Sequence, residues 1–194
     1  MFIFDIEIKH GIAPASPAER KDGIAYCGDG WEDYQNMGVA CVVVAAYDYC
    51  FDKYRVFGES ELSDFQFFVD CHDRRAIGFN NNRFDNNVLR AAGIVVIPPQ
   101  KSYDLLSEIY SALGSYQKGC RLDDVVKANF PNSPGKTGNG AEAPELWQKG
   151  YYTRVIDYCL NDVRLTKMIL DKILRFGYIN NPVNPSQALK IRRP

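Results

Sequence analysis

The sequence has few of the residues from which proteins build zinc sites and disulfide frameworks. It contains only two histidines, His10 and His72, in unlike contexts, and its six cysteines include no Cys-x-x-Cys pair. This pattern excludes the usual ligand spacings of a zinc site. Most of the cysteines fall in apolar or helical patterns, where a reduced cysteine packs as a small hydrophobic side chain. We therefore expect a reducing, cytoplasmic (intracellular) location with few disulfides.

Long apolar runs and a strong charge imbalance are absent as well. No apolar run approaches the length needed to cross a bilayer, and no charged leader precedes the strand that begins at residue 2. We expect neither a membrane partner nor a signal peptide. The net charge is -1, so no global basic field indicates nucleic acid, although a local basic surface is compatible with this value.

A complete phosphate-binding loop is also missing. Gly135-Lys136-Thr137 resembles the end of such a loop, but Phe130 stands where the motif requires its first glycine. The preceding segment also has the pattern of a helix, whereas the motif follows a strand. The sequence therefore argues against nucleoside triphosphate binding.

What the sequence does contain is the composition of one α/β domain. Its 194 residues are 46% hydrophobic and 24% charged, which allows a globular domain with a substantial core. Hydrophobic periodicity predicts strands at residues 2–8, 38–48, 54–57, 76–79 and 94–97, and helices at residues 60–71, 84–92, 105–113, 121–129 and 153–176. This order indicates a mixed central sheet with helices on both faces.

Two segments fall outside this pattern. Residues 10–37 are rich in Gly, Pro, Asp and Ala without sustained periodicity, and we expect a long loop or flap inserted after the first strand. Residues 177–194 are expected to form a loosely held C-terminal tail. We therefore expect a single domain that spans residues 1–176 and contains the insertion.

The amino-terminal strand carries the first candidate site residues. Its even-numbered residues from Phe2 to Ile8 fall on one face, and Asp5 and Glu7 fall with Ile3 on the other. Residues one period apart on a strand are separated by roughly 7 Å. Two acids on an apolar strand need compensation, and Mg²⁺ or Mn²⁺ would supply it. The alternative is an edge strand whose solvated face carries the two acids.

Three more acids are associated with the predicted helices. Asp85 opens the helix at residues 84–92, where it could cap the helix or reach an ion held at the first strand. Tyr158 and Asp162 are four residues apart in the last helix and therefore share a face. Taken alone, Asp162 could equally be a solvated surface acid. Asp104 precedes another helix and fits a capping residue as well as a ligand.

Taken together, these motifs resemble a known family. Phe4-Asp5-Ile6-Glu7, then Asn80 through Phe84-Asp85, then Tyr158 four residues before Asp162 are similar to the three motifs of the DEDD 3′–5′ exonucleases. The tyrosine resembles that of the DEDDy branch, which includes the proofreading domains of family-B DNA polymerases. The similarity extends from residue 2 to about residue 176. The departures are the 10–37 insertion and the absence of a polymerase segment.

The resemblance implies a fold, a reaction and a set of site residues. It implies a ribonuclease-H-like fold and hydrolysis of single-stranded DNA or RNA from the 3′ end, with DNA slightly favoured and a polymerase or replication protein as partner. The cofactors would be two Mg²⁺ or Mn²⁺ ions held by Asp5, Glu7, Asp85 and Asp162. Tyr158 would position the attacking water, and Asn80 and Phe84 would contact the terminal nucleotide.

Two further points remain open at this level. Five basic residues are candidate phosphate contacts or simply solvated charges: Lys118, Arg121, Lys127, Lys136 and Arg164. Two other functions fit the same fold, namely a catalytically silent nucleic-acid-binding module and an endonuclease.

Overall fold

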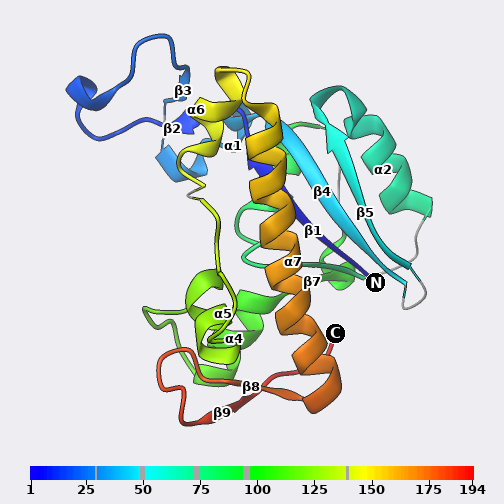
Figure 1. Ribbon diagram of the computed structural model, residues 1–194. Coiled ribbons are helices and arrows are strands. Elements are labelled where there is room, and N and C mark those ends of the chain that lie inside the picture. Colours follow the sequence, from blue (N-terminus) through cyan, green and yellow to red (C-terminus); the bar gives the residue numbers. More distant parts are fainter. Residues whose placement is uncertain (29, 49–50, 72–74, 94–96, 139) are drawn as a thin grey trace.

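The chain forms an α/β structure around a mixed five-stranded sheet (Figure 1). The computed structural model describes residues 1–28, 30–48, 51–71, 75–93, 97–138 and 140–194, with the backbone alone at 45–48 and 51–52. In the order of the sheet the strands are β5 (Phe51–Gly58), β4 (Val39–Asp48), β1 (Phe2–Ile8), β6 (Ala76–Gly78) and β7 (Ser102–Asp104). β4 is antiparallel to β1 and β5, whereas β6 is parallel to β1 and β7. The strand with the first acids is therefore central.

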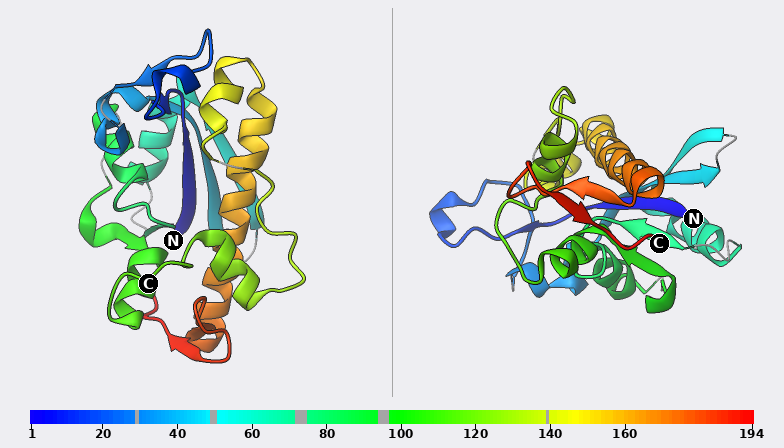
Figure 2. Two further views of the ribbon diagram at one scale, coloured as in Figure 1. Left: turned by 90° about the vertical axis from the view of Figure 1, so that its left-hand side faces the viewer. Right: turned by 90° about the horizontal axis from the view of Figure 1, so that it is seen from below.

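Helices cover both faces of this sheet, as the sequence predicts. Their bounds are α1 Tyr34–Met37, α2 Leu62–Cys71, α3 Asp85–Ala91, α4 Leu105–Leu113, α5 Leu122–Asn129, α6 Ala143–Gln148 and α7 Tyr152–Phe176. The long α7 crosses one face and packs with α5 and α6, while α2 and α3 pack on the other (Figure 2, right). This arrangement is compatible with a ribonuclease-H-like fold.

The alternation of β1 divides the core into two clusters. Phe2 and Phe4 are each 1% exposed and pack under α2 and α3, whereas Ile3 is fully buried under α7. Because β1 has a neighbour strand on each side and helices above and below, both of its faces lose contact with water. The edge-strand alternative is therefore wrong, and Asp5 and Glu7 share the α7 side with Ile3.

The insertion at residues 10–37 has more structure than a plain loop. β2 (Gly11–Ile12) pairs in parallel with β3 (Tyr26–Cys27), and two short 3₁₀ turns, η1 (Pro17–Glu19) and η2 (Gly30–Glu32), lead to α1. The buried Met37 and Cys27 anchor the segment in the core. Strands this short carry too few residues for a periodic signal, which explains why the sequence indicated only a loop.

The C-terminal segment is not loosely held, contrary to expectation. β8 (Tyr178–Asn180) pairs antiparallel with β9 (Ala188–Lys190), and Ile179 and Ile191 are buried in the α7 cluster. α7 ends at Phe176, and the capping residue Gly177 has a φ of 76°, so the chain turns back onto the core.

The remaining comparisons concern the elements between α2 and α7. Residues 94–96 of the strand expected at 94–97 lie outside the described residues. The sequence did not predict β7, the turn η4 (Pro99–Lys101) before it or the short α6. None of the described helices combines the length and the apolar character needed to span a bilayer.

Candidate metal centre

The centre begins with two acids of β1 and a thiol of α7. Glu7 is 6% exposed and Asp5 is partly buried. The Cys159 thiol donates to the backbone oxygen of Asp5 at 3.4 Å and to its Oδ2 at 3.5 Å. One ligand atom from each of the three residues lies within 4.8 Å of the other two. The alternation of β1 and the helical period of α7 thus place these groups face to face.

Asp85 reaches the same region from the opposite side of the strand. Its Oδ1 accepts a hydrogen bond of 3.3 Å from the backbone nitrogen of Ile6, which lies between Asp5 and Glu7. Asp104 holds the turn that precedes Asp85, because its carboxylate accepts from the backbone nitrogens of Asn80 and Asn82. The same carboxylate caps α4, which confirms the capping interpretation of Asp104.

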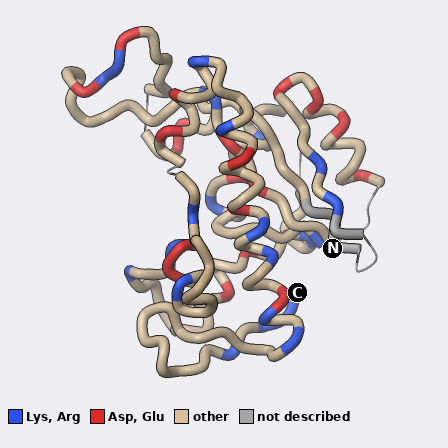
Figure 3. The backbone as a smooth tube through the Cα atoms, viewed as in Figure 1, with Lys and Arg blue, Asp and Glu red and all other residues tan. Residues whose placement is uncertain are grey.

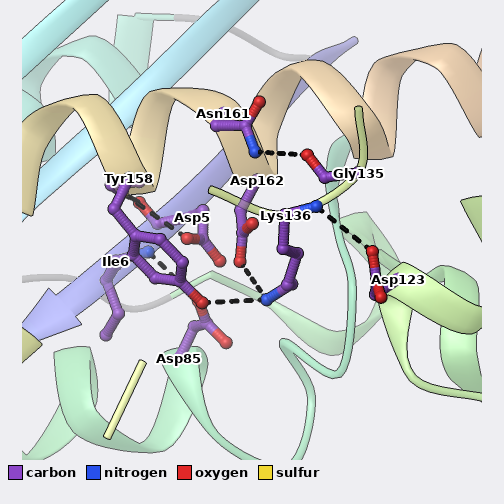
Figure 4. Close-up of polar contacts among 10 residues, drawn as sticks. Asp5, Ile6, Asp85, Asp123, Gly135, Lys136, Tyr158, Asn161 and Asp162 are labelled. Carbon is purple, nitrogen blue, oxygen red and sulfur yellow. Dashed lines mark hydrogen bonds and ion pairs between the residues drawn. The ribbon is translucent and has the colours of Figure 1, made fainter. Parts of the chain in front are cut away.

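Asp162 and Tyr158 complete the centre from one face of α7, as Figure 4 shows. Asp162 is 6% exposed, and its Oδ2 is paired with the ammonium group of Lys136. Its other oxygen, Oδ1, is buried and has no hydrogen-bond partner among the described residues. A buried carboxylate oxygen in this state carries an unmet desolvation cost and is suited to accept a ligand.

Lys136 enters the centre from the loop between α5 and α6. Its Nζ donates to the Tyr158 hydroxyl at 2.9 Å, and its backbone nitrogen donates to Asp123 Oδ1 at 3.1 Å. Asn161 of α7 donates to the carbonyl of Gly135 at 3.2 Å. Gly135 has a φ of 72°, and a Cβ there would lie 2.6 Å from Asp123 Oδ1, so this loop path requires glycine.

The pKa values of the acids move upward together. Burial is the largest cause for Asp5, followed by repulsion from Asp85 and Asp162, and its pKa is raised well above the ordinary value. Burial and then Asp5 raise the pKa of Glu7. Burial raises the pKa of Asp85 to about 7. The folded protein therefore resists full ionisation of these carboxyl groups unless a cation compensates them.

The pKa values of Lys136 and Tyr158, which lie beside Asp162, respond to different causes. Burial lowers the pKa of Lys136, but attraction to Asp162 and Tyr158 outweighs burial, and the net pKa is above the ordinary value. Burial and then Asp162 raise the pKa of Tyr158. At neutral pH Lys136 is thus a cation and Tyr158 a neutral phenol.

The residues present fit hard divalent cations. Carboxylate oxygens are the ligands that Mg²⁺ and Mn²⁺ prefer, and Asp162 offers a buried oxygen without a partner. Cys159 is a soft group of this cluster, but burial raises its pKa well above the ordinary thiol value. It therefore stays protonated and acts as a hydrogen-bond donor to Asp5.

The structure brings some of the other predicted residues to the centre and leaves others away from it. Phe84 directly precedes Asp85, and Asn80 lies in the same turn with a φ of 69°. Of the five basic candidates, Lys136 contacts the acids, while Lys127 pairs with Asp123 and Arg164 stacks over the ring of Tyr54. Lys118 and Arg121 are exposed.

Sequence reasoning missed the contact of Cys159 with Asp5 and the contacts of Lys136 with Asp162 and Tyr158. A signal existed, because Gly135, Gly138 and Gly140 surround Lys136 in the sequence. A Cβ at Gly138 would lie 3.0 Å from the Tyr158 ring. Glycines at this spacing indicate a loop that must pass close to other groups.

The sequence matches no protein-family model and no curated protein.

A first prediction concerns the metal-free protein. Because the pKa of Asp85 is about 7 in the folded state and 3.8 ordinarily, the folded protein retains a proton that the unfolded chain releases. Its free energy of unfolding should fall by up to about 4 kcal/mol as the pH rises from about 4 to about 7, at roughly 1.4 kcal/mol per pKa unit. Urea unfolding in EDTA at a series of pH values measures this dependence.

The variant Asp85→Asn should weaken the pH dependence of the free energy of unfolding. Asp70→Asn, which alters an exposed acid of α2, should leave this pH dependence unchanged. Equal slopes for the wild type and Asp85→Asn would contradict the prediction.

Proposed function

We propose that the protein is an intracellular, metal-dependent 3′–5′ exonuclease that hydrolyses phosphodiester bonds of single-stranded nucleic acid, with DNA slightly favoured over RNA. The observation that supports this most is the convergence of Asp5, Glu7, Asp85 and Asp162 from β1, α3 and α7. Asp5 and Glu7 offer ligand oxygens within 4.8 Å of each other, and Asp85 accepts from the nitrogen of Ile6 between them. Figure 4 shows Asp162 of α7 at the same centre, and repulsion from Asp85 and Asp162 raises the pKa of Asp5 in agreement with this arrangement. A ribonuclease-H-like fold, implied by the motif resemblance, would place them in this way.

The four carboxylates would hold the two divalent ions, Mg²⁺ or Mn²⁺. When bound, such ions lower the pKa of a water that attacks phosphorus and stabilise the negative charge of the leaving 3′ oxygen. Asp162 would bind an ion through its Oδ1, which has no partner among the described residues.

Tyr158 and Lys136 have roles of their own in this proposal. Since Tyr158 remains protonated at neutral pH, it cannot act as a base and would instead orient the attacking water. Lys136 donates to the hydroxyl oxygen, which leaves the hydroxyl hydrogen for an oxygen acceptor. The ammonium group would also contact a phosphate oxygen of the substrate and offset its charge.

Substrate contacts and partners follow from the motif resemblance. Asn80 and Phe84 are proposed to contact the terminal nucleotide, and a polymerase or another replication protein is the partner we would test first. Neither proposal is needed for the reaction itself.

The second prediction is metal-dependent release of mononucleotides from the 3′ end of a linear single strand. Gel analysis of 5′-labelled DNA and RNA with Mg²⁺, Mn²⁺ or EDTA measures it, and a circular single strand should remain intact. Asp5→Ala and Asp162→Ala should abolish activity while the fold survives, because each removes a ligand and relieves repulsion. Asp70→Ala is the matched control and should retain activity.

Other outcomes would identify the alternatives. Cleavage of the circular strand would indicate an endonuclease. The absence of metal-dependent cleavage of any strand would favour a silent binding module and overturn the proposal.

The third prediction concerns the Tyr158 hydroxyl. Tyr158→Phe keeps the ring but removes the group that orients water, so the single-turnover rate should fall roughly 10²-fold. Mn²⁺ affinity should stay nearly unchanged, because the hydroxyl is not a ligand. Tyr152→Phe, an exposed tyrosine of the same helix, serves as the control. An unchanged rate for Tyr158→Phe would remove Tyr158 from the catalytic residues.

A further inference from the structure

The insertion at residues 10–37 is fixed against the rest of the molecule at several points (Figures 1 and 2). Gln148 of α6 donates to the carbonyls of Lys9 and Ala25 at 2.8 and 3.0 Å, and it accepts from the nitrogen of Ala25 at 2.7 Å. On the other side, the Tyr34 hydroxyl donates to the carbonyl of Arg83 at 3.0 Å. The segment therefore bridges α6 and the turn before α3.

Trp31 is the unusual residue of this segment. It is 69% exposed although it is a large aromatic residue, and its ring centroid lies 6.3 Å from that of Phe84 in an edge-on arrangement. Tyr34 approaches Phe84 from another direction at 6.5 Å. Phe84 directly precedes Asp85 and packs against the core cluster of α2 and α3. With Trp31 and Tyr34 it forms an aromatic group at the start of α3.

The charges of the insertion decide what such a surface could bind. Residues 10–37 contain five acidic residues and two basic ones, which gives a formal charge of -3. Figure 3 shows both signs of charge interspersed along the backbone, without a basic cluster that follows this segment. An acidic segment repels phosphate, whereas an exposed indole binds the uncharged face of a base by stacking.

We propose that Trp31 and Phe84 form a stacking platform for the bases at the 3′ end of a single-stranded polynucleotide. The inference rests on the proposed exonuclease function, which requires a strand to enter the acidic centre. Trp31 would hold the bases next to the scissile phosphate, and it would act on substrate affinity and not on the chemical step. Stacking tolerates any base, so the platform would recognise single strands without sequence preference.

The test uses binding and kinetics on the full chain. Trp31→Ala should weaken binding of a 5′-labelled oligothymidylate, measured by fluorescence polarisation, by about tenfold, within the range of aromatic stacking on a base. Phosphorothioate linkages at the 3′ end keep the strand intact in Mg²⁺. In hydrolysis of an unmodified strand, KM should rise by a similar factor while kcat changes little. Trp31→Phe should lose less, because it keeps a ring.

Two controls separate stacking from other effects. Phe67→Ala removes an aromatic residue of α2 with matched exposure of 70% and should bind like the wild type. Trp147→Phe leaves Trp31 as the sole tryptophan of the chain. Its fluorescence should be quenched by the strand and much less by a strand whose last three nucleotides are abasic.

The outcomes distinguish this inference from the proposed function. Suppose that the wild type is active, that the Trp31 variants match it in strand binding and KM, and that the abasic strand quenches Trp31 as strongly as the normal strand. These results would overturn the stacking platform and leave the exonuclease proposal intact. If the wild type hydrolyses nothing, the exonuclease proposal fails, and polarisation and quenching still decide whether Trp31 stacks on bases. Absence of any strand binding would overturn both.

Discussion

The centre of this protein is organised by repulsion among buried carboxylates. Asp5 and Glu7 present ligand oxygens within 4.8 Å of each other on the central strand, where two negative charges repel by about 3 kcal/mol at an effective dielectric constant of 20. Asp85 and Asp162 add to this repulsion. The rest of the site can be understood as the means by which the chain tolerates this charge.

Three contacts lower the free-energy cost of this repulsion. The backbone nitrogen of Ile6 donates to Asp85, and the Cys159 thiol donates to Asp5. The ammonium group of Lys136 pairs with Asp162. These contacts are incomplete, because Asp162 Oδ1 still has no partner among the described residues. An incompletely compensated acidic site is suited to cations that bind with substrate, and it ties ion binding to the stability of the fold.

Local pattern was enough to predict the elements that carry the acids. The alternation of β1 assigned Asp5 and Glu7 to one face, and the helical period assigned Tyr158 and Asp162 to one face of α7. Burial of β1 on both sides could not be read from its sequence, because it depends on β4 and β6, which join it from distant parts of the chain. Lys136 lies 26 residues before Asp162, and only the path of the Gly135 loop brings the two together. The packing of Ile179 likewise depends on contacts that no local pattern encodes.

In the proposed function, the acids of β1, α3 and α7 form one divalent-cation site. Anomalous diffraction from crystals soaked with Mn²⁺ and a mononucleotide tests it most directly. We expect two Mn²⁺ peaks roughly 3.5–4 Å apart, ligated by Asp5, Glu7, Asp85 and Asp162. Mn²⁺ bound elsewhere on the chain, with these four carboxylates free of metal, would contradict it.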